Sequence, residues 1–231
     1  MKSENKTSRI LGAAFLLQAV TSFTSGVFLL KPLTAPGNIT EVMVNIANHP
    51  LMMRANILGE IITAAGIIFL GAVLFIFLRN QGEKMALTAL GLYILEAVLL
   101  AASRMEAFSL LRISQEYVSA GASASLLSMG SLALESMSFE YNLAMMGFCI
   151  GGILFYYLLD KARIVPRVLS LWGLISAIPL LVATVMAILG YKVSFYVYVP
   201  YIPFEFAIGI WILIKGIKTP FIETRSFVGN E

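Results

Sequence analysis

Residues 52–78 read MMRANILGEIITAAGIIFLGAVLFIFL, and this stretch decides the fold class. It exceeds the ~20 apolar residues that cross a hydrocarbon core of about 30 Å. Its acidic residue, Glu60, is followed by Ala64 and Gly71. Steps of four and eleven residues fall on one face of an α-helix, so the carboxylate shares its face with small residues where another helix can approach closely. The stretch therefore predicts a membrane-spanning helix that turns a glutamate toward its neighbours.

Two other apolar stretches repeat the pattern of a glutamate followed at helical spacing by small residues: Glu140 with Ala144, Gly147 and Gly151, and Glu205 with Gly209 and Gly216. Carboxylates are expensive in lipid, so they usually face a bundle interior or a wet cavity. Small residues at such spacing are also a common packing device between membrane helices. The pattern makes the bundle interior the place to look for function, and it leaves any ligand unidentified.

The composition is that of a membrane protein with several spans. Hydrophobic residues make up 59% of the 231 residues and charged residues only 13%, whereas soluble domains carry about a quarter charged residues. The length suits one bundle rather than several domains. The net charge of +3 comes from basic residues in short loops at helix ends. Such residues set the orientation in the membrane, so nucleic acid is not an expected partner.

The inventory of reactive side chains excludes several kinds of site. The chain has one cysteine, Cys149, and one histidine, His49. It therefore forms no internal disulfide, no bis-histidine haem site and no Cys/His zinc cluster. We expect no metal and no cofactor, and no catalytic residue can be named.

We predict an all-α fold, a six-transmembrane-helix bundle with both termini cytoplasmic and a long outer connection, 109–137, between the third and fourth helices. Residues 1–9 are the cytoplasmic N-terminus, 10–217 the membrane domain and 218–231 a cytoplasmic tail. The first span is interpreted as a retained helix rather than a signal peptide, because its apolar run is too long. The six predicted spans are 10–30, 52–78, 85–108, 138–159, 168–190 and 194–215.

Basic residues determine the predicted orientation. With six spans, Arg54, Arg104, Lys31, Arg112 and Lys192 lie on or near the opposite side from the other eleven. By the positive-inside rule the richer side is cytoplasmic, so both termini are predicted to lie inside. The richer side holds Lys2, Lys6, Arg9, Arg79, Lys84, Lys161, Arg163, Arg167, Lys215, Lys218 and Arg225.

Several outer segments have their own signals. Residues 38–47 are expected to form a short surface helix, and the apolar residues within 119–132 to lie along the interface. Pro179 is expected to kink its helix. Pro200 and Pro203 indicate either a helix interrupted just before Glu205 or one that simply begins near Pro203. The tyrosines and phenylalanine of 191–201 are interpreted as an outer aromatic belt.

The polar residues of the spans fall mostly in the outer half of the membrane, which favours an outward-facing polar crevice above a sealed floor. Two arginines cannot neutralise four glutamates, so some carboxylates must be protonated, exposed to water or matched by a ligand cation. Alternatively, the arginines pair with glutamates and merely pin the bundle. The candidate ligand-binding residues are Arg54, Asn56, Glu60, Glu96, Arg104, Glu140 and Glu205.

Four stretches resemble the bacterial membrane family called domain of unknown function 4386: KTSRILGAAFLLQAV (6–20), RANILGEIITAAGIIFLGAVLFIFL (54–78), MALTALGLYILEAVLLA (85–101) and GGILFYYLLDKARIVPRVLSLWGLIS (151–176). The resemblance runs over nearly the whole chain, from Lys6 to Ile217, and implies a six-helix inner-membrane protein without a known activity. Its most specific part is the turn in which Pro166 and Arg167 open a helix. Members often have an arginine where this chain has Tyr93, so the resemblance implies no fixed Arg–Glu pair there. The positions carried over are Arg54, Glu60, Glu96, Pro166 and Arg167.

Three functions remain open. The first is binding or transport of a small polar molecule, a cation or a lipid headgroup in the polar crevice. The second is a membrane-embedded enzyme on a lipid-type substrate, in which paired carboxylates serve as acid and base; no Ser–His or Cys–His pair supports it. The third is a structural or accessory membrane protein. The bilayer is the expected partner, and the oligomeric state is not indicated.

Overall fold

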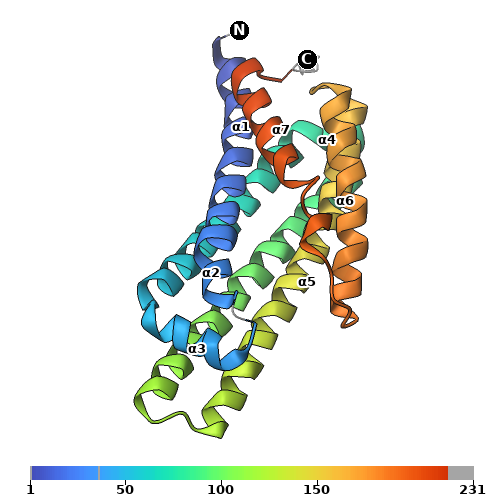
Figure 1. Cartoon of the computed structure of the whole chain (residues 1–231). Helices are drawn as coiled ribbons and strands as arrows, with labels where there is room; N and C mark the ends of the chain where they lie inside the picture. The colour runs from blue at the N-terminus through green and yellow to red at the C-terminus, as the bar shows by residue number, and fades with distance from the viewer. Residues whose placement is uncertain (1, 36, 218–231) are drawn as a thin grey trace, which may run out of the picture.

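The computed structural model describes residues 2–35 and 37–217, and within these ranges the protein is helical and contains no strand. The predicted C-terminal tail, with Lys218 and Arg225, lies outside the described residues. Both the start of α1 and the end of α7 lie at one end of the molecule, and α3 lies toward the other (Figure 1). The elements are α1 Lys2–Phe23, a π-helical segment η1 Thr24–Leu30, α2 Lys31–Thr34, α3 Ile39–Asn48, α4 Pro50–Ser119, α5 Ala124–Ala162, α6 Arg167–Ile188, a 3₁₀ turn η2 Phe195–Val197 and α7 Ile202–Lys215.

Helix α4 is a helical hairpin. Its backbone leaves helical geometry at Gly82, with φ 172° and ψ 82°, and the chain reverses there. The two limbs, 50–81 and 83–119, lie side by side: Arg104 Nη1 donates to Asn56 Oδ1 at 3.0 Å, and Gly71 lies against Tyr93. The predicted spans 52–78 and 85–108 are therefore helical, and the break between them is a single residue.

The predicted long outer connection was wrong. Residues 109–119 continue α4 and residues 124–137 belong to α5, so the connection is only the turn 120–123. Ser123 caps α5, because its side chain accepts a hydrogen bond from the backbone N–H of Leu126 at 3.3 Å. The apolar residues within 119–132 had been expected to lie along the interface, but residues 124–132 continue into α5, which packs against α4 and α3.

The last predicted span is only partly helical. Residues 195–197 form one 3₁₀ turn, and α7 begins at Ile202 with Pro203 in its first turn. Of the two alternatives for the prolines, the late start is therefore correct. With 14 residues, α7 is shorter than the ~20 that cross a membrane.

Four helical stretches are long and apolar enough to cross a membrane, and they are Arg9–Thr34, Pro50–Ser119, Ala124–Ala162 and Arg167–Ile188. Because Pro50–Ser119 is the α4 hairpin, it contributes two apolar limbs. Helix α6 is continuous through Pro179. The N-terminal residues that were predicted to precede the first span are the start of α1.

Apolar side chains form two separate cores. The larger, which we call the bundle core, joins α1, α4, α5, α6 and α7 toward the Gly82 end. The smaller, which we call the cap cluster, lies at the α3 end. The short helix predicted over 38–47 is α3. The side chain of its N-cap residue, Asn38, accepts a hydrogen bond from the backbone N–H of Glu41 at 2.8 Å. The cap cluster consists of Leu33, Val42, Met43, Ile46, Met53, Ala107, Leu110, Leu111, Tyr117, Ala133 and Met137.

Candidate functional site

A pocket of about 430 Å³ lies between the two cores. Its walls come from α1 and η1, from both limbs of α4, from α5 and from the segment 198–206. Glu60, Glu96, Arg104 and Glu205 all line it. Residues far apart in the sequence, on the two limbs of α4 and on α7, are thus brought to one cavity.

The other three candidate residues lie elsewhere. Asn56 is fully buried behind the pocket wall, next to Arg104. Arg54 is exposed at the start of α4, and Glu140 is partly buried on α5; neither belongs to the lining. The residues that follow Glu140, Tyr141 and Asn142, do line the pocket. The same spacing of small residues follows all three glutamates, but only Glu60 and Glu205 line the pocket, and Glu140 does not.

Arg104 is held by neutral groups. Its Nε and Nη2 atoms donate to Ser103 Oγ at 3.1 and 2.9 Å, and Nη1 donates to Asn56 Oδ1 at 3.0 Å. The amide of Asn56 in turn donates to the carbonyl of Ser25 in η1 at 3.0 Å. This chain ties the two limbs of α4 to η1. The three guanidinium nitrogens of Arg104 therefore each donate a hydrogen bond to a neutral group rather than to a carboxylate.

The pocket carboxylates are not joined to Arg104 by a salt bridge. Arg104 forms no ion pair within 4.0 Å with Glu60, Glu96 or Glu205, although it lies near enough to Glu60 to attract its carboxylate electrostatically. Glu96 is 5% exposed, and its Oε2 atom is buried without a hydrogen-bond partner. A buried, unpaired charge costs several kcal/mol, of the order ~3 kcal/mol or more. The alternative in which arginines pin the glutamates through direct ion pairs is not seen at Arg104, whose hydrogen bonds go to Ser103 and Asn56.

Sequence reasoning missed two polar residues of the pocket. Gln18 of α1 and Tyr201 are the hydrogen-bonding neighbours of Glu205, and the Oε1 atom of Gln18 is buried without a partner. Gln18 is the only amide in the apolar run 10–30, a signal that was available. Tyr201 had been placed in an aromatic belt. It is instead 5% exposed and hydrogen bonded to Tyr156 through the hydroxyl groups.

The π-helical segment η1 shapes one wall of the pocket. Gly26, Val27 and Leu30 contribute to the lining. The wider turn of a π-helix is often found at functional sites. The first limb of α4 approaches η1 closely at Gly59, where an added Cβ would collide with the side chain of Ser25. A glycine at this position lets the two helices meet beside the pocket.

The family model described as Domain of unknown function (DUF4386) matches residues 10–216. The chain belongs to this family. No curated protein and no solved structure matches it. Among the DUF4386 positions expected from the resemblance, Glu60 and Glu96 line the pocket, while Arg54 does not.

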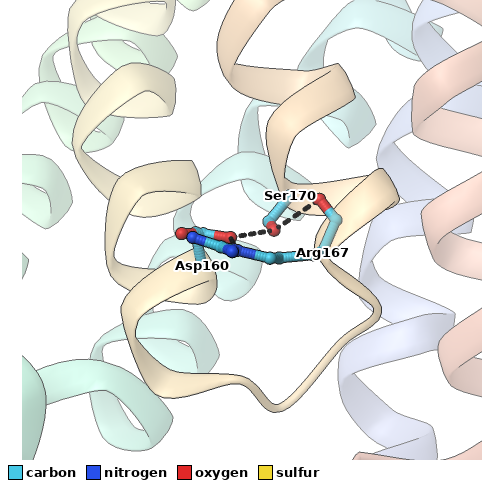
Figure 2. A network of polar contacts seen from close by, with 3 residues as sticks. All are labelled: Asp160, Arg167 and Ser170. Atoms are coloured by element: carbon cyan, nitrogen blue, oxygen red, sulfur yellow. Dashed lines mark hydrogen bonds and ion pairs between the residues drawn. The ribbon is translucent and has the colours of Figure 1, made fainter.

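The DUF4386 turn with Pro166 and Arg167 is structural. Pro166 precedes α6, and Arg167 Nε donates to Asp160 Oδ1 at 3.3 Å. Ser170 Oγ donates to the same oxygen at 3.1 Å and also contacts the Arg167 carbonyl (Figure 2). Asp160 is thus paired with a cation and a hydroxyl. Asp160 thus stabilises a turn, whereas the three pocket glutamates line a cavity.

Proposed function

We propose that this protein is a six-span inner-membrane protein that binds or transports a small polar molecule, a cation or a lipid headgroup in the pocket. The segment from η2 through α7 completes the sixth crossing, and both termini are cytoplasmic. One observation supports this orientation. Gln81, beside the Gly82 turn, accepts a hydrogen bond from Lys161 at 2.6 Å, so two basic loops share one end. The α3 end then lies on the extracytoplasmic side.

The observation that carries the proposal is the set of three carboxylates that line one pocket and form no salt bridge with its arginine, Arg104. Keeping such groups is costly unless something compensates for them. A bundle stabilised only by packing would gain from apolar residues at these positions. A cavity of this size also falls within the roughly 300–1,000 Å³ range of small-molecule sites.

The direct test is native mass spectrometry of the full chain extracted in a mild detergent. We expect the wild-type protein to carry a co-purified small molecule, and Glu60→Gln and Glu205→Gln to lose it. The control is Glu83→Gln, an exposed glutamate beside the Gly82 turn, which should retain the ligand. Size-exclusion profiles check that all variants are folded. An identified ligand that both pocket variants retain in full would overturn the proposal.

A further inference from the structure

The charge of the pocket points to a cation. Glu60, Glu96 and Glu205 line it together with Arg104 and Lys31. The donors of Arg104 are directed to Ser103 and Asn56. The unpartnered Oε2 of Glu96 and Oε1 of Gln18 are acceptors, both on side chains that are 5% exposed. Acceptors in excess of donors favour a positively charged hydrogen-bond donor over an anion.

The spacing of the acidic groups does not suit a metal ion. Among the described residues, no group of three or more His, Cys, Asp or Glu side chains lies close enough together to hold one. Metal ligands must converge to about 2.0–2.6 Å from the ion. The glutamates come instead from the two limbs of α4 and from α7, a looser arrangement that leaves room for a larger organic cation.

Aromatic rings supply the second half of the recognition. Phe23 and Phe206 meet edge to face at 6.0 Å, and Phe148 and Tyr201 do so at 5.2 Å. All four rings line the pocket, as does Tyr198. Aromatic faces attract ammonium groups, by about 0.5–2 kcal/mol for each well-placed ring. Aromatic residues beside carboxylates are the combination that recognises organic ammonium groups.

Resting on the proposed function, we propose that the pocket binds an organic ammonium group carried on an apolar body. The ammonium lies near Glu96, with Glu60 and Glu205 completing the negative surroundings, and the apolar body lies against the phenylalanines and η1. Two sources share this chemistry. One is a free lipophilic amine, and the other is the ethanolamine headgroup of a membrane lipid.

The test uses isothermal titration calorimetry of the full chain in the uncharged detergent dodecyl maltoside. The probes are benzyltrimethylammonium and benzylphosphonate, which share an aromatic body and carry opposite charges. We expect saturable binding of the ammonium probe to wild-type protein and to Glu83→Gln. Glu96→Gln should weaken that binding at least tenfold. Benzylphosphonate should bind more weakly than the ammonium probe to the wild type and to Glu83→Gln. Thermal melts identify a misfolded variant, in which case Glu205→Gln replaces Glu96→Gln.

A second arm distinguishes the two sources. The protein is loaded with phosphatidylethanolamine or phosphatidylglycerol before native mass spectrometry. Retention of the ethanolamine lipid by wild type but not by Glu96→Gln, with displacement of the ammonium probe, supports a lipid source. Displacement by neither lipid supports a free amine.

The two proposals fail in different ways. Tight benzylphosphonate binding that does not depend on Glu96, or ammonium binding unchanged in both glutamine variants, overturns the ligand class while a pocket ligand still stands. Absence of any probe binding together with absence of a co-purified molecule overturns both.

Discussion

The cap cluster and the pocket are neighbouring regions on the same helices, and they are built on opposite principles. In the cap cluster Met43, Met53 and Leu110 are fully buried in apolar contacts. Within two turns along α4, Met53 gives way to Asn56 and Glu60, which are also buried but polar. The difference teaches that stability and recognition are separated along each helix. The two apolar cores hold the fold, and the layer between them is free to carry groups that packing alone would not select.

The largest effect is expected when the cap cluster loses a central side chain. Met43→Ala leaves a cavity against Gly130 and α4, and should lower the free energy of unfolding by about 3 kcal/mol. Binding of the ammonium probe by the folded fraction should be unchanged, because Met43 does not line the pocket. Denaturant titration in detergent measures the first, and calorimetry the second. The matched control is Met105→Ala, since Met105 is 72% exposed. If the Met43 variant kept its full stability but lost probe binding, the cap cluster and the pocket could not have the separate roles described above.

The next effect tests the polar chain behind the pocket. Asn56→Leu removes the acceptor of Arg104 and the donor to Ser25. We expect a loss of about 2 kcal/mol, because buried partners are left unsatisfied. Unlike Met43→Ala, this change should also alter ligand affinity, since Arg104 is released to reach the carboxylates. Exposed Asn48→Leu is the control. Equal behaviour of the two leucine variants in melts and titrations would contradict the prediction.

A third change probes the glycine contact that brings α1 beside α7. A Cβ at Gly12 would lie 2.5 Å from Leu213 N and 2.9 Å from Gly209 O, so backbone must move. Gly12→Ala should cost about 1–3 kcal/mol through overpacking. It should also weaken probe binding, because Gln18 and Glu205 belong to these two helices. At exposed Gly91 a Cβ meets nothing within 4 Å, so Gly91→Ala is expected to be neutral. The prediction fails if Gly12→Ala melts at the wild-type temperature.

The smallest effect on stability is expected in the pocket itself. Glu60→Gln removes a buried carboxylate that forms no salt bridge within 4.0 Å with Arg104. It should change the free energy of unfolding by only about 0.5 kcal/mol or raise it, since no ion pair is lost and burial of a charge is avoided. Ligand binding should nevertheless fall. A melting temperature reduced as far as in Met43→Ala would show that Glu60 is a structural residue.

The helices could largely be predicted from the periodicity and length of the apolar stretches, but the contacts between side chains on different helices could not. The turn at Gly82, the helix over 39–48 and the inward orientation of Glu60 follow from local patterns. Residues 124–137 were misjudged because small polar residues are poor spanning material alone, yet are held in α5 by their neighbours. Tyr201 was misjudged because an aromatic residue near a helix end suits both an interface and a buried hydroxyl network.

The sequence by itself determined that the chain is helical and apolar enough to cross a membrane several times, because backbone groups in hydrocarbon must be satisfied within each segment. It also determined which helix faces carry acidic residues, since the helical repeat is local. Only the tertiary structure decided that Arg104 binds Ser103 and Asn56 rather than a glutamate. It likewise decided that Gln18 and Tyr201 adjoin Glu205. The physical reason is that partners depend on the rotation and register of whole helices, which arise from packing across the bundle.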